Sequence, residues 1–565
     1  MDGEHTGWSA ALQATMCATL VDEWIGRGLA AVMVAPGSRS TPVALEVARR
    51  PELAVHVFHD ERSAAFAALG WARATRLPAA VLCTSGTAAT HLHAAVVEAG
   101  LSGIPLLVMT ADRPPELHGV GAPQTIDQVR LYGRAVRWFA DIAPATPADV
   151  PSWRVVAAEA WNRATGHRPG PVHLNVGLRE PLLGESGPLP PPVDWAAVAA
   201  PPGDLTPVMD LIDAQRGVIV AGEGVDDPPA VERWSAASNW PVLADPQSGC
   251  RGIDGSVAAF DALLRHRQFA ADHTPQVVVQ LGMAPASKAL GEWLAAAPGC
   301  RHVAVSPYGL VSDPRLVGAT QVHAPIGVFA EQAAGQVRGA AGTPWRARWL
   351  HAERTAQRIF DDRLGGSISE PAVARLLSTL PPGRHLVVSS SMPVRDLEWF
   401  GAPGAGPAVH ANRGANGIDG VLATAIGVAL TGVRTTVLIG DIALCHDASS
   451  LTALAARGLD LDIVVIDNDG GGIFSFLAQA GALDAPRFER LFGTPHGTDL
   501  VALAAAHGVP ARTVTSPEEL RAEVTGGRDG ARGARLIRVA SNRAANVTDH
   551  RALNDAVGAA LDRSA

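Results

Sequence analysis

Residues 435–472 read TTVLIGDIALCHDASSLTALAARGLDLDIVVIDNDGGG. Two runs in this stretch, Thr435–Ile439 and Leu461–Ile466, are short, apolar and rich in β-branched residues, as buried parallel strands are. The segment 446–457 between them predicts one helix. Because a strand–helix–strand unit crosses over right-handedly, the carboxyl ends of its two parallel strands open on the same edge of the sheet. The stretch therefore predicts a parallel α/β fold with a shared edge after these strands.

Two polar side chains are expected at that edge, Asp441 after the first strand and Asn468 after the second. Mg²⁺ takes oxygen ligands in octahedral geometry and combines one or two carboxylates with phosphate oxygens and water. Asp441, the Asn468 amide oxygen and the backbone carbonyl of Gly470 could hold such an ion against a diphosphate, and the glycines let the backbone approach it. An ordinary strand–helix turn with an Asp cap and a glycine-rich loop explains the pair equally well.

Composition indicates a globular enzyme of several domains. The chain has 565 residues, 47% of them apolar and 18% charged, which predicts three or four domains. A net charge of −9 without a basic run argues against a nucleic-acid partner. The five cysteines are scattered without CxxC spacing, which indicates reduced thiols and no zinc site. The absence of a long apolar stretch and of an apolar targeting core predicts a cytoplasmic protein without a membrane partner.

Proline-rich and charged joints divide the chain into three blocks. The stretch Gly187–Pro192, with Pro201-Pro202 beyond it, predicts a stiff connector, and Trp345–Leu364 predicts a charged connecting helix. Each block alternates strands with alanine-rich helices, which predicts a doubly wound parallel-sheet α/β domain. The first and third blocks are alike in length and pattern, which suggests a pseudo-repeat. The predicted domains are residues 1–185, 205–345 and 368–550.

The expected strands are short and apolar. In the first block they are Ala31–Val34, Ala54–Phe58, Ala79–Cys83 and Pro105–Met109; in the second, Gly217–Ala221, Pro241–Ala244, Gln276–Leu281 and His302–Val305; in the third, Leu386–Ser389, Thr435–Ile439, Asp462–Ile466 and Arg535–Arg538.

Three turns of the first block offer groups that could bind a ligand. Glu61 opens a predicted helix directly after a strand, and Asp60 is expected to cap that helix. The turns Thr84–Thr87 and Pro36–Pro42 likewise join a strand end to a helix start, where N–H groups and hydroxyls can seat an anion or a cofactor. Helix-dipole preference alone would explain Glu61, and turn chemistry alone would explain either turn, so only their combination indicates a function.

Taken together, the motifs resemble those of thiamine-diphosphate enzymes of the decarboxylase type. An acidic residue after a first-block strand, small-residue turns in the same block and a Gly-Asp…Asn metal motif in the last block carry the resemblance. The matching stretches are Pro36–Pro42, Asp60–Arg62, Thr84–Ala88, Thr110–Glu116, Asn412–Gly420 and Gly470–Ser475. The middle block matches mainly around Lys288. The resemblance implies the thiamine-diphosphate-binding fold, with a pyrimidine-binding domain, a central domain and a domain that binds the diphosphate and Mg²⁺.

The resemblance also implies a reaction. The motifs are most similar to the family member that decarboxylates 2-oxoglutarate and adds the succinyl-semialdehyde carbanion 1,4 to isochorismate in menaquinone biosynthesis, a carboligase of the transferase class. Both substrates are dianions, so their pocket needs several cations, and the arginine fork is the best partner for a carboxylate. Members of the family are homo-oligomers with active sites at the subunit interface, which implies a homodimer or a dimer of dimers here.

The resemblance assigns roles to individual residues. The implied catalytic residues are Glu61, Ser391, Arg395 and Arg413. The implied substrate-binding residues are Ser38, Arg39, Arg113, Gln124, Lys288, Ser391, Arg395, Arg413, Phe474 and Leu477. The implied cofactor-binding residues are Glu61, Thr84, Ser85, Gly86, Ser390, Met392, Gly417, Ile418, Gly440, Asp441, Ile442, Ala443, Asn468, Gly471, Gly472 and Ile473. The implied ligands of Mg²⁺, for which Mn²⁺ could substitute, are Asp441, Asn468 and Gly470.

The chain departs from the family pattern at three positions. Ile442 replaces a glycine, Asp467-Asn468 replaces an Asn-Asn pair, and Ser390 stands where some relatives carry asparagine. Two other functions stay open. A simple 2-oxo acid decarboxylase or acetohydroxyacid synthase would need fewer cations, and a non-catalytic α/β binding protein would not need Glu61. Any single arginine could also form an ordinary surface ion pair.

Overall fold

The computed structural model describes residues 8–192, 208, 210–307, 319–337, 344–526 and 533–564. Residues 1–7, Pro201-Pro202 and the predicted start of the middle domain at residue 205 lie outside these ranges. None of the helices within them is both long and apolar enough to cross a membrane. The chain divides into two compact units: the amino-terminal region joins segments 412–432 and 447–453 in one unit, and the remainder forms the other.

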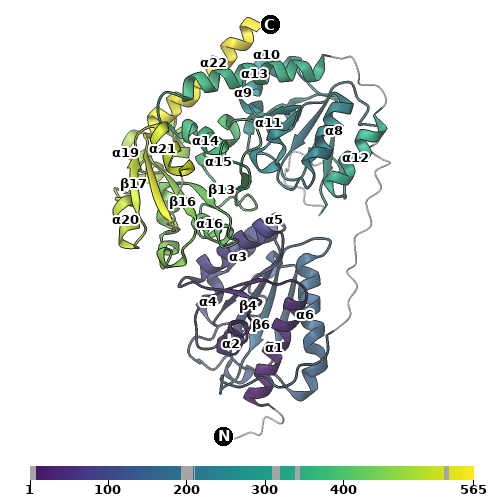
Figure 1. The fold of residues 1–565 in the computed structure, drawn as a ribbon, viewed down its shortest axis with the longest axis vertical. Coiled ribbons are helices and arrows are strands. Elements are labelled where there is room, and N and C mark those ends of the chain that lie inside the picture. Colours follow the sequence, from purple (N-terminus) through teal and green to yellow (C-terminus); the bar gives the residue numbers. More distant parts are fainter. Residues whose placement is uncertain are drawn as a thin grey trace. The chain divides into compact units, whose positions relative to one another are not determined.

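The fold contains three sheets, each of six parallel strands in the described part of the chain (Figure 1). The first sheet consists of β1 (Ala31–Val34), β2 (Ala54–Val57), β3 (Ala79–Cys83), β4 (Leu106–Asp112), β5 (Trp138–Ile142) and β6 (Pro171–Gly177). The second consists of β7 (Gly217–Ala221), β8 (Val242–Ala244), β9 (Ser256–Val257), β10 (Val277–Leu281), β11 (Arg301–Val305) and β12 (Thr320–Val322). The third consists of β13 (His385–Val388), β14 (Ala408–His410), β15 (Thr435–Gly440), β16 (Leu461–Asp467), β17 (Ala511–Val514) and β18 (Arg535–Ala540).

Strand order confirms the predicted pseudo-repeat. The first sheet runs β2-β1-β3-β4-β6-β5 and the third runs β14-β13-β15-β16-β18-β17, so the two sheets have the same topology. The second sheet runs β12-β11-β10-β7-β8-β9, which is the doubly wound order 3-2-1-4-5-6 read from its other edge. In sheets of this kind ligands bind beyond the carboxyl ends of the strands. The doubly wound α/β fold class is therefore confirmed, and it directs attention to the turns after the strands.

Helices connect the strands and cover the sheets (Figure 1). The first unit contains α1 (Ala10–Gly26), α2 (Thr41–Ala48), α3 (Glu61–Thr75), α4 (Thr87–His91), α5 (His93–Ser102), α6 (Val150–Thr165) and α16 (Val421–Ala429). Around the second sheet are α8 (Pro228–Ser238), α9 (Phe260–Arg265), α10 (Arg267–Asp272), α11 (Lys288–Ala296), α12 (Ile326–Gln336) and α13 (Trp345–Leu364). Around the third are α14 (Glu370–Ser378), α15 (Met392–Phe400), α17 (Asp441–His446), α18 (Gln479–Ala482), α19 (Ala485–Phe488), α20 (Leu500–Ala506), α21 (Pro517–Thr525) and α22 (Arg543–Ser564).

Strand β7 illustrates how both faces of a sheet are buried. Its residues alternate between two apolar clusters: Ile219 packs with Trp234 and Phe329 of helices α8 and α12, whereas Val218 packs in the cluster that contains Trp349 of α13. Successive strand residues point to opposite faces, so a strand covered on both sides must be apolar throughout. This requirement explains why the predicted strands read as continuous apolar runs.

Helices α3 and α16 pack unusually closely within the first unit. A Cβ atom at Gly70 would lie 2.0 Å from the carbonyl oxygen of Thr424, and one at Gly427 would lie 1.9 Å from that of Ala67. Any side chain at either glycine would therefore push the helices apart. This contact fixes the segment after β14 against the helix that begins at Glu61.

The predicted helix over 446–457 is wrong. Helix α17 runs from Asp441 to His446, and the chain then forms two short 3₁₀ turns, Ala448–Leu451 and Ala455–Arg457. Between the turns Ala453 has a left-handed φ of 59°, which a continuous α-helix does not permit. The Asp447 side chain accepts a hydrogen bond from the Ala423 N–H at 2.9 Å, so it caps α16 instead of continuing its own helix.

Candidate active site

The turn after β2 places Glu61 at the first position of α3, where its side chain is half-buried. Asp60 caps the helix, as predicted, by accepting hydrogen bonds from the N–H groups of Arg62 at 2.8 Å and Ser63 at 3.4 Å. Its other carboxylate oxygen accepts the Ser449 hydroxyl at 2.5 Å. Burial alone would raise the pKa of Asp60, but these hydrogen bonds and the nearby Arg62 lower it. The start of the helix is therefore firmly held.

The turns after β3 and β4 meet. Arg113 donates to the hydroxyl of Ser85 and, at 2.9 Å, to the carbonyl oxygen of Gln124, whose own amide donates to the Ser85 carbonyl at 3.0 Å. Gly86 has a φ of +83°, and a Cβ atom there would lie 2.8 Å from Gln124. The structure thus brings together Ser85, Gly86, Arg113 and Gln124, which the sequence separates by up to 39 positions.

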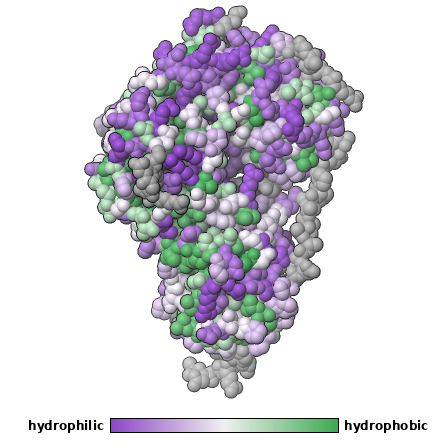
Figure 2. All heavy atoms as spheres, in the orientation of Figure 1, coloured by the Kyte–Doolittle hydropathy of each residue, from purple (hydrophilic) through white to green (hydrophobic). Residues whose placement is uncertain are grey.

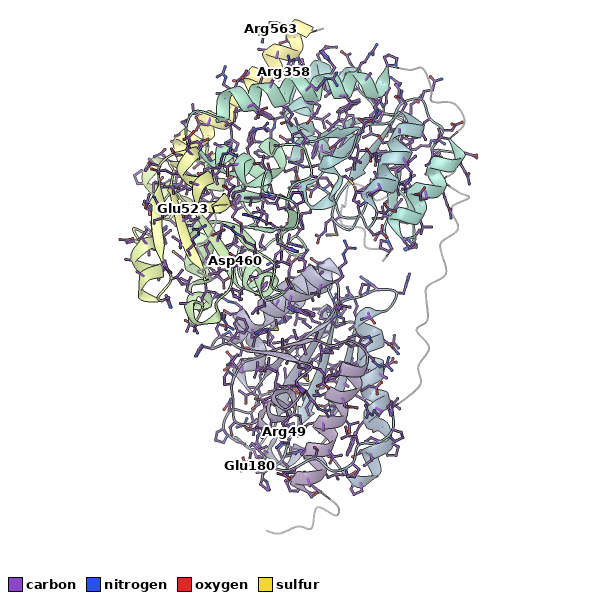
Figure 3. The ribbon with its side chains drawn as sticks, viewed as in Figure 1. Arg49, Glu180, Arg358, Asp460, Glu523 and Arg563 are labelled. Atoms are coloured by element: carbon purple, nitrogen blue, oxygen red, sulfur yellow. The ribbon has the colours of Figure 1, made fainter. Side chains whose placement is uncertain are left out.

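The turn after β1 joins this group through Arg39 and Thr84. A Cβ atom at Gly37 would lie 2.3 Å from the Thr84 side chain, so the two turns are in contact. Arg39 is 7% exposed, donates to the carbonyl oxygen of Leu178 at 3.0 Å and pairs with Glu180 at 2.9 Å (Glu180 is labelled in Figure 3). Burial lowers the pKa of Arg113, and repulsion from Arg39 lowers it further. Two neighbouring guanidinium groups at strand ends form a seat for an anion. Ser38, in the same turn, is exposed.

In the second unit, Asp441 follows β15 and is 2% exposed. One of its carboxylate oxygens accepts the N–H groups of Asn468 and Gly470, each at 3.0 Å, and the other accepts the N–H of Ile442 at 2.6 Å. Burial raises the pKa of Asp441, whereas the N–H groups of Gly470 and Ile442 act in the opposite direction. The turns after β15 and β16 are therefore tied together by one carboxylate.

Asn468 presents an amide oxygen that could bind a metal ion. Its side-chain nitrogen donates to Glu370 at 3.0 Å, which orients the amide, and its Oδ1 atom is buried without a hydrogen-bond partner among the described residues. A buried polar atom of this kind costs free energy unless something binds it. Beside it, Asp441, Asp467 and His496 offer potential ligand atoms within 4.8 Å of one another. This donor set fits a divalent cation.

The glycine run after Asn468 permits a close backbone approach. Gly470 has a φ of +143°, and a Cβ atom there would lie 1.9 Å from the carbonyl oxygen of Gly493. The carbonyl oxygen of Gly470, a predicted metal ligand, accepts the Gly472 N–H at 2.9 Å and retains a second lone pair. Ile473 and Phe474 follow in a 3₁₀ turn that ends at Phe476, and the Leu477 side chain is 44% exposed.

The turn after β13 holds a strained residue. Ser391 adopts φ 76° and ψ −131° immediately before α15, a conformation that only glycine adopts easily. Its carbonyl oxygen accepts a hydrogen bond from Arg395, and the next residue in that helix, Asp396, pairs with buried His550 at 2.6 Å. Backbone strain of this kind clusters at functional sites because the surrounding structure must maintain it. Ser390 and Met392, on either side, are buried.

The segment after β14 carries Arg413, Gly417 and Ile418, which are all half-buried in the first unit.

Lys288 belongs to the second unit. Its side chain is 84% exposed, pairs with Glu292 at 3.2 Å and lines a groove of about 860 Å³ that contains none of the other predicted site residues. Figure 2 shows hydrophilic residues gathered over helices α13 and α22 of the same unit. Among the described residues of the second unit, Lys288 pairs with Glu292 and not with a residue of the turns after β13, β15 and β16.

Some residues at these turns carried no signal in the sequence. Glu370 accepts a hydrogen bond from the Asn468 amide, and His496 lies 3.5 Å from Asp441. Asp447 accepts the backbone N–H of Ala423, and Glu98 accepts that of Gly414, next to Arg413. Each lies far along the chain from its partner or outside any recognisable motif. Only their contacts in the folded chain identify them.

Three family models match the chain. They are described as "Thiamine pyrophosphate enzyme, N-terminal TPP binding domain" over residues 16–131, "Middle domain of thiamine pyrophosphate" over 203–388, and "Thiamine pyrophosphate enzyme, C-terminal TPP binding domain" over 405–539. Together with the strand-end turns, they define the class: an enzyme that depends on thiamine pyrophosphate, the cofactor also called thiamine diphosphate.

Similar proteins narrow the class. The chain is similar to proteins named 2-succinyl-5-enolpyruvyl-6-hydroxy-3-cyclohexene-1-carboxylate synthase. It is 41% identical to the one from Chloroflexus aurantiacus, over 98% of this chain and 97% of that relative. It is 42% identical to the one from Thermobifida fusca, over 96% of this chain and 98% of that relative. The synthase of Myxococcus xanthus is 39% identical over 98% of each chain. The chain belongs to this synthase family.

Proposed function

We propose that the protein decarboxylates 2-oxoglutarate and joins the remaining four-carbon unit to isochorismate, forming 2-succinyl-5-enolpyruvyl-6-hydroxy-3-cyclohexene-1-carboxylate in menaquinone biosynthesis. The observation that carries the substrate assignment is that Arg39 and Arg113 lie on one cluster of strand-end turns, in which the Gly37 turn contacts Thr84 and Arg113 donates to Ser85. The carboxylates near these two guanidinium groups are Asp112 and the largely exposed Glu180. Such a pair of cations suits a substrate with several carboxylates.

Thiamine diphosphate supplies the electron sink that stabilises the carbanion formed when a 2-oxo acid loses CO₂. The chain's own residues bind and orient it. Asp441, the Asn468 amide oxygen and the Gly470 carbonyl would hold Mg²⁺, or Mn²⁺ in its place, because they offer the hard oxygen donors that these ions prefer. The residues assigned to the rest of the cofactor are Thr84, Ser85, Gly86, Ser390, Met392, Gly417, Ile418, Gly440, Ile442, Ala443, Gly471, Gly472 and Ile473.

Glu61 would exchange a proton with N1′ of the aminopyrimidine. Its position supports this role, because the capped start of α3 fixes the backbone while leaving the side chain half-buried. A carboxylate held in this way can act as a proton donor and acceptor without reorganising the helix.

The substrate carboxylates would bind to Arg39, Arg113, Arg395 and Arg413, with Ser38, Ser391 and Gln124 as hydrogen-bonding partners. Phe474 and Leu477 would line the acceptor pocket, and an apolar lining excludes water from the carboxylate that is lost. Lys288 belongs to this set on the resemblance alone, since its exposed side chain pairs with Glu292.

The larger organisation follows the same proposal. Residues 1–185, 205–345 and 368–550 would form the pyrimidine-binding, central and diphosphate-binding domains, and the protein would be a homodimer or a larger homo-oligomer with shared active sites. A cytoplasmic location is supported by the five cysteines, all of which are unpaired. Sedimentation velocity would measure the oligomeric state directly.

Incubating the protein with both substrates, Mg²⁺ and thiamine diphosphate, followed by mass detection of the product, tests the reaction. We expect CO₂ release to require isochorismate and the adduct to form in equal amount. Release of CO₂ at the same rate without isochorismate would instead indicate a simple decarboxylase. Glu61→Gln should lower turnover at least about a thousandfold while cofactor binding persists, and Glu52→Gln, at an exposed site in the same unit, should not.

A further inference from the structure

Glu98 makes an unusual set of contacts in the first unit. It lies in helix α5 and is 3% exposed. One of its carboxylate oxygens accepts the backbone N–H of Gly414 at 2.8 Å, and the other accepts that of Ala415 at 2.7 Å. Two consecutive N–H groups of one loop are thus held by the two oxygens of one side chain.

The loop that Glu98 holds, residues 412–420, connects β14 to α16. It carries Arg413, Gly417 and Ile418, and its Asn416 adopts a left-handed φ of 59°. A Cβ atom at Gly414 would lie 2.7 Å from the backbone carbonyl oxygen of Glu98, so the loop lies directly against α5. Ala415 and Asn416 are themselves exposed.

Two further groups compensate for the buried charge of the Glu98 carboxylate. The Ser102 hydroxyl donates to it at 2.7 Å, and the buried guanidinium of Arg73 lies 3.5 Å away. Burying a carboxylate is unfavourable unless hydrogen bonds and an opposite charge compensate for the lost water. Here two of the compensating donors are N–H groups of the loop. The position of the loop backbone and that of the Glu98 carboxylate therefore depend on each other.

We propose that Glu98 is a positioning residue of the active site, which acts by clamping the Gly414 and Ala415 N–H groups so that Arg413 and Ile418 on either side of them are held in their binding conformations. The inference rests on the proposed function for the roles of Arg413 and Ile418. The clamp itself rests only on the contacts of Glu98 and can be tested separately.

The test compares Glu98→Gln with Glu23→Gln in the full-length protein. Glutamine at position 98 cannot accept both N–H groups, because one of its terminal atoms is itself a donor. Glu23 is also buried in the first unit, where it pairs with Arg27 and Arg154, but it has no contact with the loop. It therefore controls for the loss of a buried ion-paired glutamate. Ser102→Ala removes a partner of Glu98 while leaving the clamp intact.

Three measurements separate the possible outcomes. In the cofactor-free protein, hydrogen exchange at Gly414 and Ala415 should accelerate at least about tenfold in Glu98→Gln only, because a hydrogen bond to a charged group is lost. The dissociation constant of thiamine diphosphate, from titration calorimetry, should rise about tenfold in the same variant. The Michaelis constant for the substrate 2-oxoglutarate should rise as well, whereas Glu23→Gln and Ser102→Ala should stay within about twofold of wild type.

Unchanged exchange in Glu98→Gln would overturn the clamp. Faster exchange with an unchanged dissociation constant and Michaelis constant would overturn the positioning role, since the loop would then be held without consequence for binding. The same losses of affinity in Glu23→Gln would also overturn it by showing a general effect of destabilisation. Failure of the wild-type protein to form the adduct would count against the proposed function, and the exchange measurement would still decide the clamp.

Discussion

The backbone N–H of Asn468 donates to the Asp441 carboxylate at 3.0 Å, so the two proposed metal-binding residues are linked before any ion binds. This bond places Asn468, but it does not decide which end of its amide faces Asp441. Glu370 decides it, because the Asn468 amide nitrogen donates to the Glu370 carboxylate at 3.0 Å and leaves Oδ1 without a hydrogen-bond partner in the part of the chain that the structure describes. Glu370 is 3% exposed and also accepts the Ser541 hydroxyl at 2.8 Å.

We therefore expect Glu370→Leu to weaken metal binding about 10- to 100-fold, as loss of a partner behind a metal ligand commonly does. Glu370→Gln should have a much smaller effect, because its amide oxygen can still accept the Asn468 N–H. Electron paramagnetic resonance of Mn²⁺ in the presence of thiamine diphosphate measures the affinity. Equal affinities in the two variants would show that the Asn468 amide needs no orientation from Glu370.

Ser391 leads to a second prediction. A non-glycine residue at φ 76° and ψ −131° costs roughly 1–3 kcal/mol, whereas glycine adopts this conformation freely. After allowing for the extra flexibility of glycine in the unfolded chain, Ser391→Gly should raise the free energy of unfolding by about 1 kcal/mol. Ser391→Ala, which keeps the strain, should not raise it.

If the Ser391 hydroxyl also contacts the substrate, both variants should lose activity, and only the glycine variant should be more stable. Chemical denaturation and steady-state kinetics on the same preparations provide the two measurements. A glycine variant that is both more stable and fully active would mean that the strain serves no part of the reaction.

Asp447 gives a pH-dependent prediction. Its carboxylate is buried beneath the start of α16, accepts the Ala423 N–H and the Ser450 hydroxyl at 2.9 Å each, and has Arg62 of α3 at 3.8 Å. Burial raises the pKa of Asp447 from 3.8 to about 6, despite the opposing effect of these groups. Because the folded protein binds this proton more tightly than the unfolded chain, the stability due to protonated Asp447 is lost as the pH rises from about 4 through 6.

Asp447→Asn cannot titrate, so it should avoid that loss. Relative to the variant, the wild type should lose up to about 3 kcal/mol of unfolding free energy between pH 4 and pH 7, from the size of the pKa change. Urea denaturation of both proteins across this range is the measurement. A constant difference between wild type and variant at every pH would contradict the raised pKa.

The sequence was informative where candidate functional side chains lie directly after a strand. Asp441, Asn468, Glu61 and Ser85 were recognisable because each lies a few residues after an apolar run, and parallel topology gathers strand ends on one edge. Strands with internal polar residues were harder to recognise. Strand β6 contains His173 and Asn175, which interrupt its apolar pattern. Thr110 of β4 contacts both, at 2.8 and 2.9 Å, and Asn175 also forms hydrogen bonds with Asp112, Gln128 and Asp141.

Residues that act across long sequence separations could not be found in this way. Glu98 and Gly414 are 316 positions apart, and Glu370 and Asn468 are 98 apart. A glutamate on a helix has no local feature that reveals whether it faces solvent or holds a distant loop. The helix expected over 446–457 failed for a related reason, because Asp447 is recruited to the start of α16.

Arg113 provides the final prediction. It donates to the carbonyl oxygen of Gln124, which the resemblance to the family implies is near the acceptor substrate. If that implied role holds, the Arg113 guanidinium should bind isochorismate rather than 2-oxoglutarate. Arg113→Gln should raise the Michaelis constant for isochorismate about 10- to 100-fold, the usual loss for a charge-assisted hydrogen-bonding pair, and change that for 2-oxoglutarate much less. Arg49→Gln, which removes a half-exposed arginine paired with Glu46 in the same unit (Figure 3), should alter neither. Equal increases for both substrates would instead assign Arg113 to a region that they share, and an increase for 2-oxoglutarate alone would place it on the donor side.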